Sequence, residues 1–438
     1  MRHARVGLSI LLALALAAYA AAIAGAAVPA APATPEKPPS ANKGKTGTYE
    51  CKTSNAQYNY YVYVPKSYSD ENPAGLHLYF HGQNGGGGAP NFGQWAKYFL
   101  DTYNLIGINM QYTDGDNAKD SGGKVEAAVE AIRQTCADYK IVFGRGAVGS
   151  FSGGGIPHEK LLKKFGRTAA GGPSPCPFNH SAPYDSNFWA DPAGMGLPPM
   201  SWFIGLGTKE WDMGKPTLGT TQPKTAEHLF GAALKGACPD VYLKITKDKG
   251  HSMSDDDVRE SAVQFHRSDL AFAPFIYERD FAEPALAPIV RQANGQTLGK
   301  ASAALDVLLA GAKTDAAVKA KAEVLRKKFD ERIEALFALT QELTENDAIL
   351  ANFYGNLFAQ QLGTHPKAKE IKALLADLRK KPGTQAAIQS CMGFWANFHS
   401  FLQGPALTPA APKFLEDVKT KCGEKSLVGK MATEMLGM

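Results

Sequence analysis

The stretch GSFSGGG, residues 149–155, places a serine in a turn whose neighbours are small. It follows the apolar run KIVFGRGAVG and precedes IPHEKLLKKFG, which has helical spacing. A strand, a tight turn and a helix in this order form the context of a nucleophile elbow, whose usual pattern is G-x-S-x-G. Centred on Ser152, the chain reads Ser-Phe-Ser-Gly-Gly, so Ser150 stands where the pattern has its first glycine. Serine is also small, and Ser152 is therefore the candidate nucleophile.

A serine hydroxyl needs a base to accept its proton, and the base needs an acid to orient it. His251 lies in the loop of KITKDKGHSMSDDD, after the last strand-like run, and is the predicted base. Glu210 and Asp212 both follow the strand-like run SWFI and are the candidate acids. His158, in the helix after the elbow, and His180, in a Pro-rich loop, could each contact a substrate. Together these residue types predict nucleophilic acyl transfer.

Strand-like and helix-like segments alternate around these groups. The predicted strands are YNYYVYVPKSY, GLHLYF, LIGINMQY, KIVFGRGAVG, MSWFIGLG and DVYLKIT, and the predicted helices include KVEAAVEAIRQTCADY and SDDDVRESAVQFHRSDLAFA. Such alternation predicts an α/β fold with a mostly parallel sheet and helices on both faces. Sites in these sheets lie at the carboxyl ends of strands, so the glycine-rich and polar loops should gather at one edge.

Beyond about Phe275 the strand signals end, and segments rich in Ala, Leu, Lys and Glu follow in a helical period. The sequence therefore predicts a catalytic domain over residues 46–275 and an all-α C-terminal domain over 276–438. The aromatic residues of the second domain are predicted to form its core rather than a ligand site. They are Phe353, Tyr354, Phe358, Phe394, Trp395 and Phe398.

The N-terminus predicts export. Residues 1–27 begin basic, continue apolar and end in small residues, with an A-x-A cleavage site at 24–26, as a secretory signal peptide does. A retained membrane anchor is the alternative. Residues 28–45 are rich in Pro, Ala and Lys and predict a linker. We therefore expect a secreted or periplasmic protein that has no membrane contact after cleavage.

Composition and cysteine spacing indicate which partners, metal sites and disulfides to expect. Hydrophobic residues make up 44% and charged residues 20%, and the net charge of +5 comes without long basic runs, so a nucleic-acid partner is not expected. None of the six cysteines forms a CxxC pair, which argues against a zinc site. In an exported chain an even number of cysteines predicts disulfides. Cys391 and Cys422 share the C-terminal region and are the expected pair, and the other four allow three pairings. Buried free thiols are the alternative.

The segment LYFHGQNGGGG, taken with YYVYVPKSY and the elbow, resembles the α/β-hydrolase family over about residues 46–273. The resemblance is specifically to exported esterases of the polyhydroxyalkanoate-depolymerase and feruloyl-esterase kind. It implies an oxyanion hole formed by the backbone N–H groups of Gln83 and Gly153. It also implies the chain order serine, acid, histidine, which His251 fits and which His158 and His180 do not. The acid's place in the family pattern, G-T-x-Asp, is filled here by Glu210, which is favoured over Asp212.

Other residues near the predicted site either contact the substrate or have a structural role. His81 is expected beside the substrate, as a residue that orients its loop rather than as a base. Phe178, Trp189 and Trp211 belong to or follow a long Pro-rich insertion, and they either line an aromatic acyl or sugar pocket or pack the insertion.

The resemblance implies a secreted serine esterase that acts on a small-molecule or polymer ester, with an acylated polysaccharide or a polyester as the substrate class. Its mechanism needs no metal and no organic cofactor. Two alternatives stay open. A serine peptidase has the same fold and triad, and a non-catalytic binding protein would use the helical domain for protein contact.

Overall fold

The computed structural model describes residues 43–82, 92–112, 119–166, 176–186, 188, 191–210, 216–312, 314–403 and 406–438. The predicted signal peptide, most of the predicted linker and the site residues Gln83, Trp211 and Asp212 lie outside these ranges. Within them, no helix combines the length and the apolar character that crossing a membrane requires.

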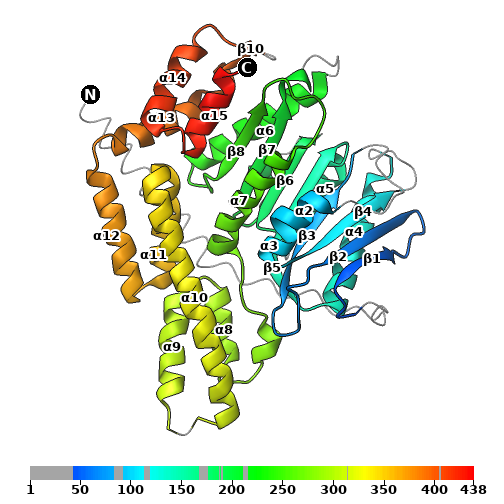
Figure 1. Cartoon of the computed structure of the whole chain (residues 1–438), viewed down its shortest axis with the longest axis vertical. Helices are drawn as coiled ribbons and strands as arrows, with labels where there is room; N and C mark the ends of the chain where they lie inside the picture. Colours follow the sequence, from blue (N-terminus) through cyan, green and yellow to red (C-terminus); the bar gives the residue numbers. More distant parts are fainter. Residues whose placement is uncertain are drawn as a thin grey trace.

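An eight-stranded sheet forms the centre of the region before about residue 275, with the strand order β1-β2-β4-β3-β5-β6-β7-β8 (Figure 1). The pairs β1–β2 and β2–β4 are antiparallel, and every later pair is parallel. This confirms the predicted fold class. The strands are β1 (Gly47–Lys52), β2 (Tyr58–Val64), β3 (Ala74–Phe80), β4 (Leu105–Tyr112), β5 (Ile141–Ser152), β6 (His180–Ser186), β7 (Ser201–Gly207) and β8 (Val241–Thr246).

Burial along the strands follows their place in the sheet. All seven residues of β3 are buried, as expected for a central parallel strand with both faces covered. In β2, near the edge, buried and half-buried residues alternate, because one face packs on the core and the other is more open.

Strand β6 was not predicted. The sequence HSAPYDS is typical of a Pro-rich loop, yet all seven residues are buried between β5 and β7. The strand is mainly polar and contains Pro183, which disfavours a central strand. Distant residues supply partners for several of its polar groups: His180 bonds the hydroxyls of Ser201 and Ser261 through its two ring nitrogens.

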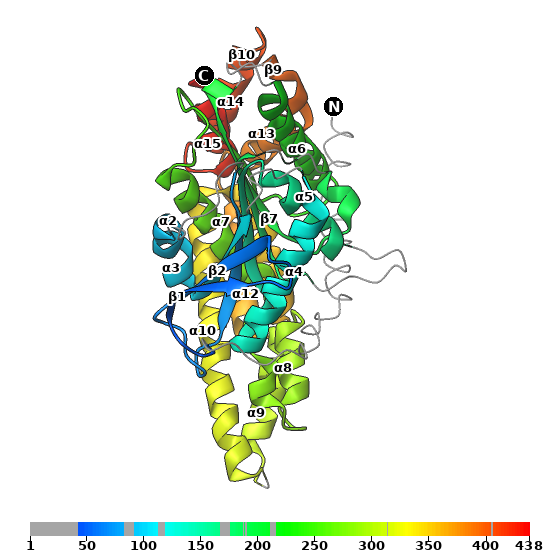
Figure 2. The same ribbon diagram turned by 90° about the vertical axis from the view of Figure 1, so that its right-hand side faces the viewer.

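Helices cover both faces of the sheet (Figure 2). On one face lie α4 (Ser121–Asp138), α5 (Gly155–Phe165) and α6 (Pro216–Leu234). On the other lie α7 (Asp255–Phe272) and the helical stretch composed of α2 (Gly93–Trp95), η1 (Ala96–Leu100) and α3 (Asp101–Tyr103). Helix α7 begins with a capping box between Ser254 and Asp257.

The C-terminal region is helical, as predicted, apart from the two-residue strands β9 (Leu402–Gln403) and β10 (Ala406–Leu407). The six aromatic residues predicted to form its core are all buried. The domain boundary near residue 275 stays a prediction. The helices are α8 (Ala287–Asn294), α9 (Leu298–Ala310), α10 (Ala316–Asn346), α11 (Ala348–Leu362), α12 (Pro366–Lys380), α13 (Thr384–Asn397), α14 (Ala411–Cys422) and α15 (Leu427–Leu436).

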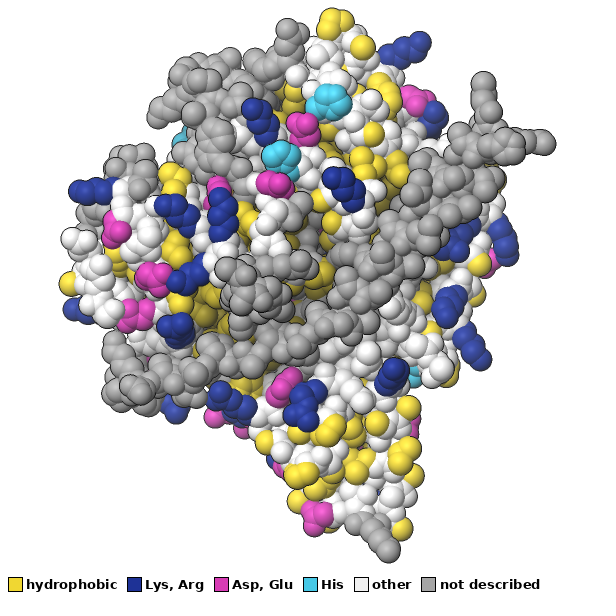
Figure 3. All heavy atoms as spheres, turned by 180° about the vertical axis from the view of Figure 1, so that it is seen from behind, with side chains coloured by type: hydrophobic (Ala, Val, Ile, Leu, Met, Phe, Trp, Pro, Cys, Tyr) yellow, Lys and Arg dark blue, Asp and Glu magenta, His cyan; other side chains and the backbone are white. Residues whose placement is uncertain are grey.

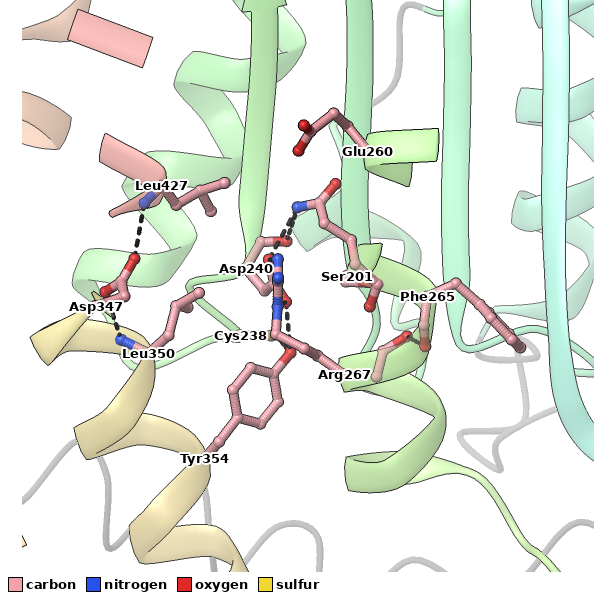
Figure 4. A network of polar contacts seen from close by, with 12 residues as sticks. Ser201, Cys238, Asp240, Glu260, Phe265, Arg267, Asp347, Leu350, Tyr354 and Leu427 are labelled. Carbon is pink, nitrogen blue, oxygen red and sulfur yellow. Dashed lines mark hydrogen bonds and ion pairs between the residues drawn. The ribbon is translucent and has the colours of Figure 1, made fainter. Parts of the chain in front are cut away.

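This helical region covers the β8 edge of the sheet, which would otherwise leave backbone groups unpaired. On α15, Glu434 accepts a hydrogen bond from the backbone N–H of Ile245 at 3.1 Å. At the start of β8, Asp240 is bound by both Arg267 of α7 and the hydroxyl of Tyr354 on α11 (Figure 4). Buried polar contacts thus join the two predicted domains.

All six cysteines are thiols in this structure, so the predicted disulfides are not present. The expected pair nevertheless comes together. The Sγ atoms of Cys391 and Cys422 lie 3.3 Å apart, which is hydrogen-bond contact rather than the roughly 2.05 Å of a disulfide. They join α13 to α14.

Candidate active site

The elbow predicted around Ser152 is a sharp strand–turn–helix junction. Strand β5 ends at Ser152, and α5 begins three residues later at Gly155. Ser152 has a φ of 53°, in the left-handed region, which costs a non-glycine residue about 1–2 kcal/mol. Such strain persists only where the surrounding structure holds it, and it gathers at functional sites. The half-buried side chain of Ser152 thus stands at the carboxyl end of a central strand.

Two glycines show why the turn must be small. A Cβ atom on Gly154 would lie 2.3 Å from the carbonyl oxygen of Phe80, so only glycine fits at the last position of the elbow pattern. A Cβ atom on Gly82 would lie 3.0 Å from the Cβ of Ser152. The chain leaving β3 therefore runs directly against the serine.

The predicted base and acid meet. Nδ1 of His251 lies 3.0 Å from Oε1 of Glu210, and the Glu210 side chain is 1% exposed whereas that of His251 is 25% exposed. The His251 ring also packs on the ring of Phe151, with centroids 4.7 Å apart. Because Phe151 directly precedes Ser152, this contact places His251 beside the elbow. Glu210 ends the short helix η3 (Thr208–Glu210), which follows β7.

Ser150, the departure from the usual elbow pattern, forms part of a buried hydrogen-bond chain. Its Oγ lies 2.8 Å from Nδ1 of His158 and 3.0 Å from Oγ of Ser186. The Ser186 hydroxyl in turn donates to the carbonyl oxygen of Ser152 at 3.0 Å. The elbow backbone is therefore held from β6. No signal in the sequence pointed to Ser186, because none pointed to β6, the strand that carries this residue.

His158 and His180 lie too deep in the fold to contact a substrate, although the sequence alone left that role open. Both side chains are fully buried, and burial lowers the pKa of each to about 3. They are therefore neutral rings that bond neighbouring hydroxyls, including Ser181 at 3.2 Å from His158.

The predicted oxyanion groups are described in part. Gly153 is buried directly after Ser152, whereas Gln83 lies outside the described residues. His81 is buried, and its Nδ1 donates to the carbonyl oxygen of Gly82 at 2.6 Å. Its ring lies 4.5 Å from that of Tyr112, between centroids. These contacts suit a residue that orients the loop after β3.

Of the remaining residues that the sequence suggested for the site, the structure describes one and leaves three outside the described ranges. Phe178 is 1% exposed and packs against Phe165, so it belongs to the core rather than to a pocket wall. Trp189, Trp211 and Asp212 lie outside the described residues. Among the residues that the structure places, no group of three or more His, Cys, Asp and Glu side chains is arranged to hold a metal ion.

The strand order, the elbow after β5 and the acid after β7 define an α/β-hydrolase fold. No protein-family model and no curated protein matches the sequence. Among solved structures, a thermostable esterase matches with 15% identity and a TM-score of 0.36 over 50% of this chain and 59% of that chain. The chain thus spans less than two thirds of that esterase.

Two further similar structures are of esterase 2 from the planctomycete Thermogutta terrifontis. The native form matches with 16% identity and a TM-score of 0.35, over 53% of this chain and 94% of that chain. The form phosphorylated by paraoxon matches with 17% identity and a TM-score of 0.35, over 50% and 91%. At these values the comparisons add nothing to the fold that the strand order already defines.

Proposed function

We propose that this chain is an exported serine hydrolase that cleaves carboxylic esters through Ser152, His251 and Glu210. The observation that carries the proposal is the position of His251. One ring nitrogen is bound to a buried carboxylate at 3.0 Å, and the ring packs on the residue next to the strained serine. A nucleophile, a base and an orienting acid are the groups that acyl transfer requires.

In the proposed reaction, Oγ of Ser152 attacks the ester carbonyl while Nε2 of His251 accepts the hydroxyl proton. Glu210 keeps Nδ1 protonated and stabilises the imidazolium that forms. The N–H groups of Gly153 and Gln83 bind the oxyanion, where one such donor contributes about 3 kcal/mol. His251 then returns the proton to the departing alcohol. Water hydrolyses the acyl-enzyme by the same steps, with His251 again as the base.

Charged side chains of both signs are mixed on the described surface of the face shown in Figure 3, where Lys and Arg are interspersed with Asp and Glu. That the chain is exported, that it acts on an acylated polysaccharide or a polyester, and that it binds no nucleic acid are parts of the proposal that rest on the sequence alone.

The test is turnover of short- and medium-chain p-nitrophenyl esters by the mature chain, beside Ser152→Ala and Glu210→Gln. We expect Ser152→Ala to lose nearly all activity and to resist labelling by a fluorophosphonate, which reacts with the wild-type serine. Glu210→Gln should keep the labelled site but turn over more slowly. Activity on peptide amides and not on esters would favour the peptidase. A wild-type chain that neither turns over nor takes the label would overturn the proposal.

A further inference from the structure

A buried lysine stands two residues before His251, in the segment between β8 and α7. The side chain of Lys249 is 7% exposed, and its Nζ lies 3.0 Å from Oδ2 of Asp185 and 2.8 Å from Oδ2 of Asp257. Both carboxylates are fully buried. Lys244 approaches Asp257 at 3.6 Å, so two cations face two anions.

Each of the two carboxylates also binds the backbone of an element that carries the site. Oδ1 of Asp185 accepts the N–H of Gly207, at the end of β7 and three residues before Glu210, at 2.9 Å. Oδ2 of Asp257 accepts the N–H of Ser254, three residues after His251, also at 2.9 Å. Lys249 therefore joins the end of the acid-bearing strand to the helix that follows the base.

The backbone around Lys249 makes the same connection. Its carbonyl oxygen accepts the N–H of Lys209, the residue before Glu210, at 3.1 Å. Asp248 donates its N–H to Oγ1 of Thr208 at 2.8 Å. Two hydrogen bonds thus join the acid loop to the base loop, through residues that directly precede the His251–Glu210 pair in each loop.

The charge state of Lys249 suits this arrangement. Burial lowers the pKa of Lys249, but the two carboxylates, Asp185 first, together raise it above its ordinary value. The ammonium group therefore stays charged. A buried cluster of paired charges is expensive to break, because removing one partner leaves the others uncompensated.

We propose that Lys249 is a positioning residue, which with Asp185 and Asp257 holds His251 and Glu210 in register with Ser152. The inference rests on the proposed function. A displacement of about 1 Å in a catalytic group can cost roughly 100-fold in rate, so a cluster that fixes both loops would matter to turnover as well as to stability.

A second buried ion pair on the same helix provides a matched control. Arg267 of α7 binds Asp240 through two 2.7 Å hydrogen bonds, at the start of β8 and facing the helical region (Figure 4). Lys249→Met and Arg267→Met should each lower the thermal midpoint. Only Lys249→Met should lower kcat for p-nitrophenyl butyrate, by roughly 100-fold with little change in KM. Both variants are assayed at a temperature at which they are folded.

Asp257→Asn tests the same idea if Lys249→Met does not fold. The amide oxygen can still accept the N–H of Ser254, so the helix cap is kept while one charge of the cluster is lost. We expect Asp257→Asn also to lower kcat, by a smaller factor than Lys249→Met does. Equal losses of kcat in the Lys249 and Arg267 variants, or wild-type kcat in Lys249→Met and Asp257→Asn, would overturn the proposal.

A second readout does not depend on ester turnover. A histidine N–H bound to a carboxylate gives a far-downfield proton resonance, and the signal of His251 is assigned by its loss in His251→Gln. We expect this resonance in the wild type and in Arg267→Met, and its loss or broadening in Lys249→Met. An inactive wild type with this pattern would refute the esterase and keep the positioning role. An unchanged resonance in Lys249→Met would refute the positioning role alone.

Discussion

Glu434, where α15 meets the edge strand, has a carboxyl group whose titration should be visible in stability. Its Oε1 accepts the hydroxyl of Tyr242 at 2.5 Å, and its Oε2 accepts the N–H of Ile245 at 3.1 Å. Burial raises the pKa of Glu434 from 4.5 to about 7, although these two hydrogen bonds act in the opposite direction. The protonated form is thus favoured in the folded chain.

The sign of the pH dependence follows from this direction. Between pH 4.5 and about 7 the folded state binds the proton of Glu434 and the unfolded state releases it. The free energy of unfolding therefore falls as the pH rises through this window. A pKa rise from 4.5 to about 7 corresponds to a loss of about 3 kcal/mol.

The variant that isolates this group is Glu434→Gln. Glutamine carries no charge at any of these pH values, and its amide can accept from Ile245 while donating to the oxygen of Tyr242. Urea unfolding of both proteins from pH 4 to pH 8 gives the difference in unfolding free energy, in which every other titrating group cancels. We expect the unfolding free energy of the glutamine variant, relative to that of the wild type, to rise by about 3 kcal/mol between pH 4 and pH 8.

A constant offset between the two proteins is compatible with this reasoning, because the amide makes slightly different hydrogen bonds. A difference that does not change with pH would refute it. So would a change of the opposite sign, since that would mean that the folded chain prefers the ionised carboxylate.

Three further predictions concern single contacts. Ser150→Ala removes a 2.8 Å hydrogen bond to the buried ring of His158 and should lower the unfolding free energy by about 1–3 kcal/mol; equal urea midpoints would contradict this. Gly154→Ala brings a Cβ within 2.3 Å of a carbonyl oxygen of β3, so fluorophosphonate labelling of Ser152, the proposed nucleophile, should slow by about tenfold or more; a wild-type labelling rate would show that the turn tolerates the methyl group. Mild oxidation should join Cys391 to Cys422, whose sulfurs are 3.3 Å apart, and stabilise the chain by about 3 kcal/mol; peptide mapping that finds both thiols still free would exclude the bond.

Much of the site could be predicted from local sequence. The elbow at Ser152 needs only a strand, small residues and a helix in succession, and those are short-range signals. His251 followed from its place after the last strand-like run. The apolar strands and the helical C-terminal region followed from hydrophobic periodicity, which reports burial directly.

Strand β6 shows where such reasoning stops. Periodicity and propensity both oppose it, since it is mainly polar and contains Pro183. It is a central strand because residues distant in sequence supply its hydrogen-bond partners, such as Ser261 for His180. The supports of the site on this strand, Ser186 and Asp185, were hidden for the same reason.

By itself, the sequence of this protein determined the fold class and the choice of a candidate nucleophile and a candidate base, because each depends on the pattern of a continuous segment. Tertiary structure decided that Glu210 reaches His251, at 3.0 Å across two loops. It also decided that Ser150 and Lys249 have buried partners. A charged or polar side chain looks the same in sequence whether water or a carboxylate faces it, and only the fold brings together the groups that make it part of a site.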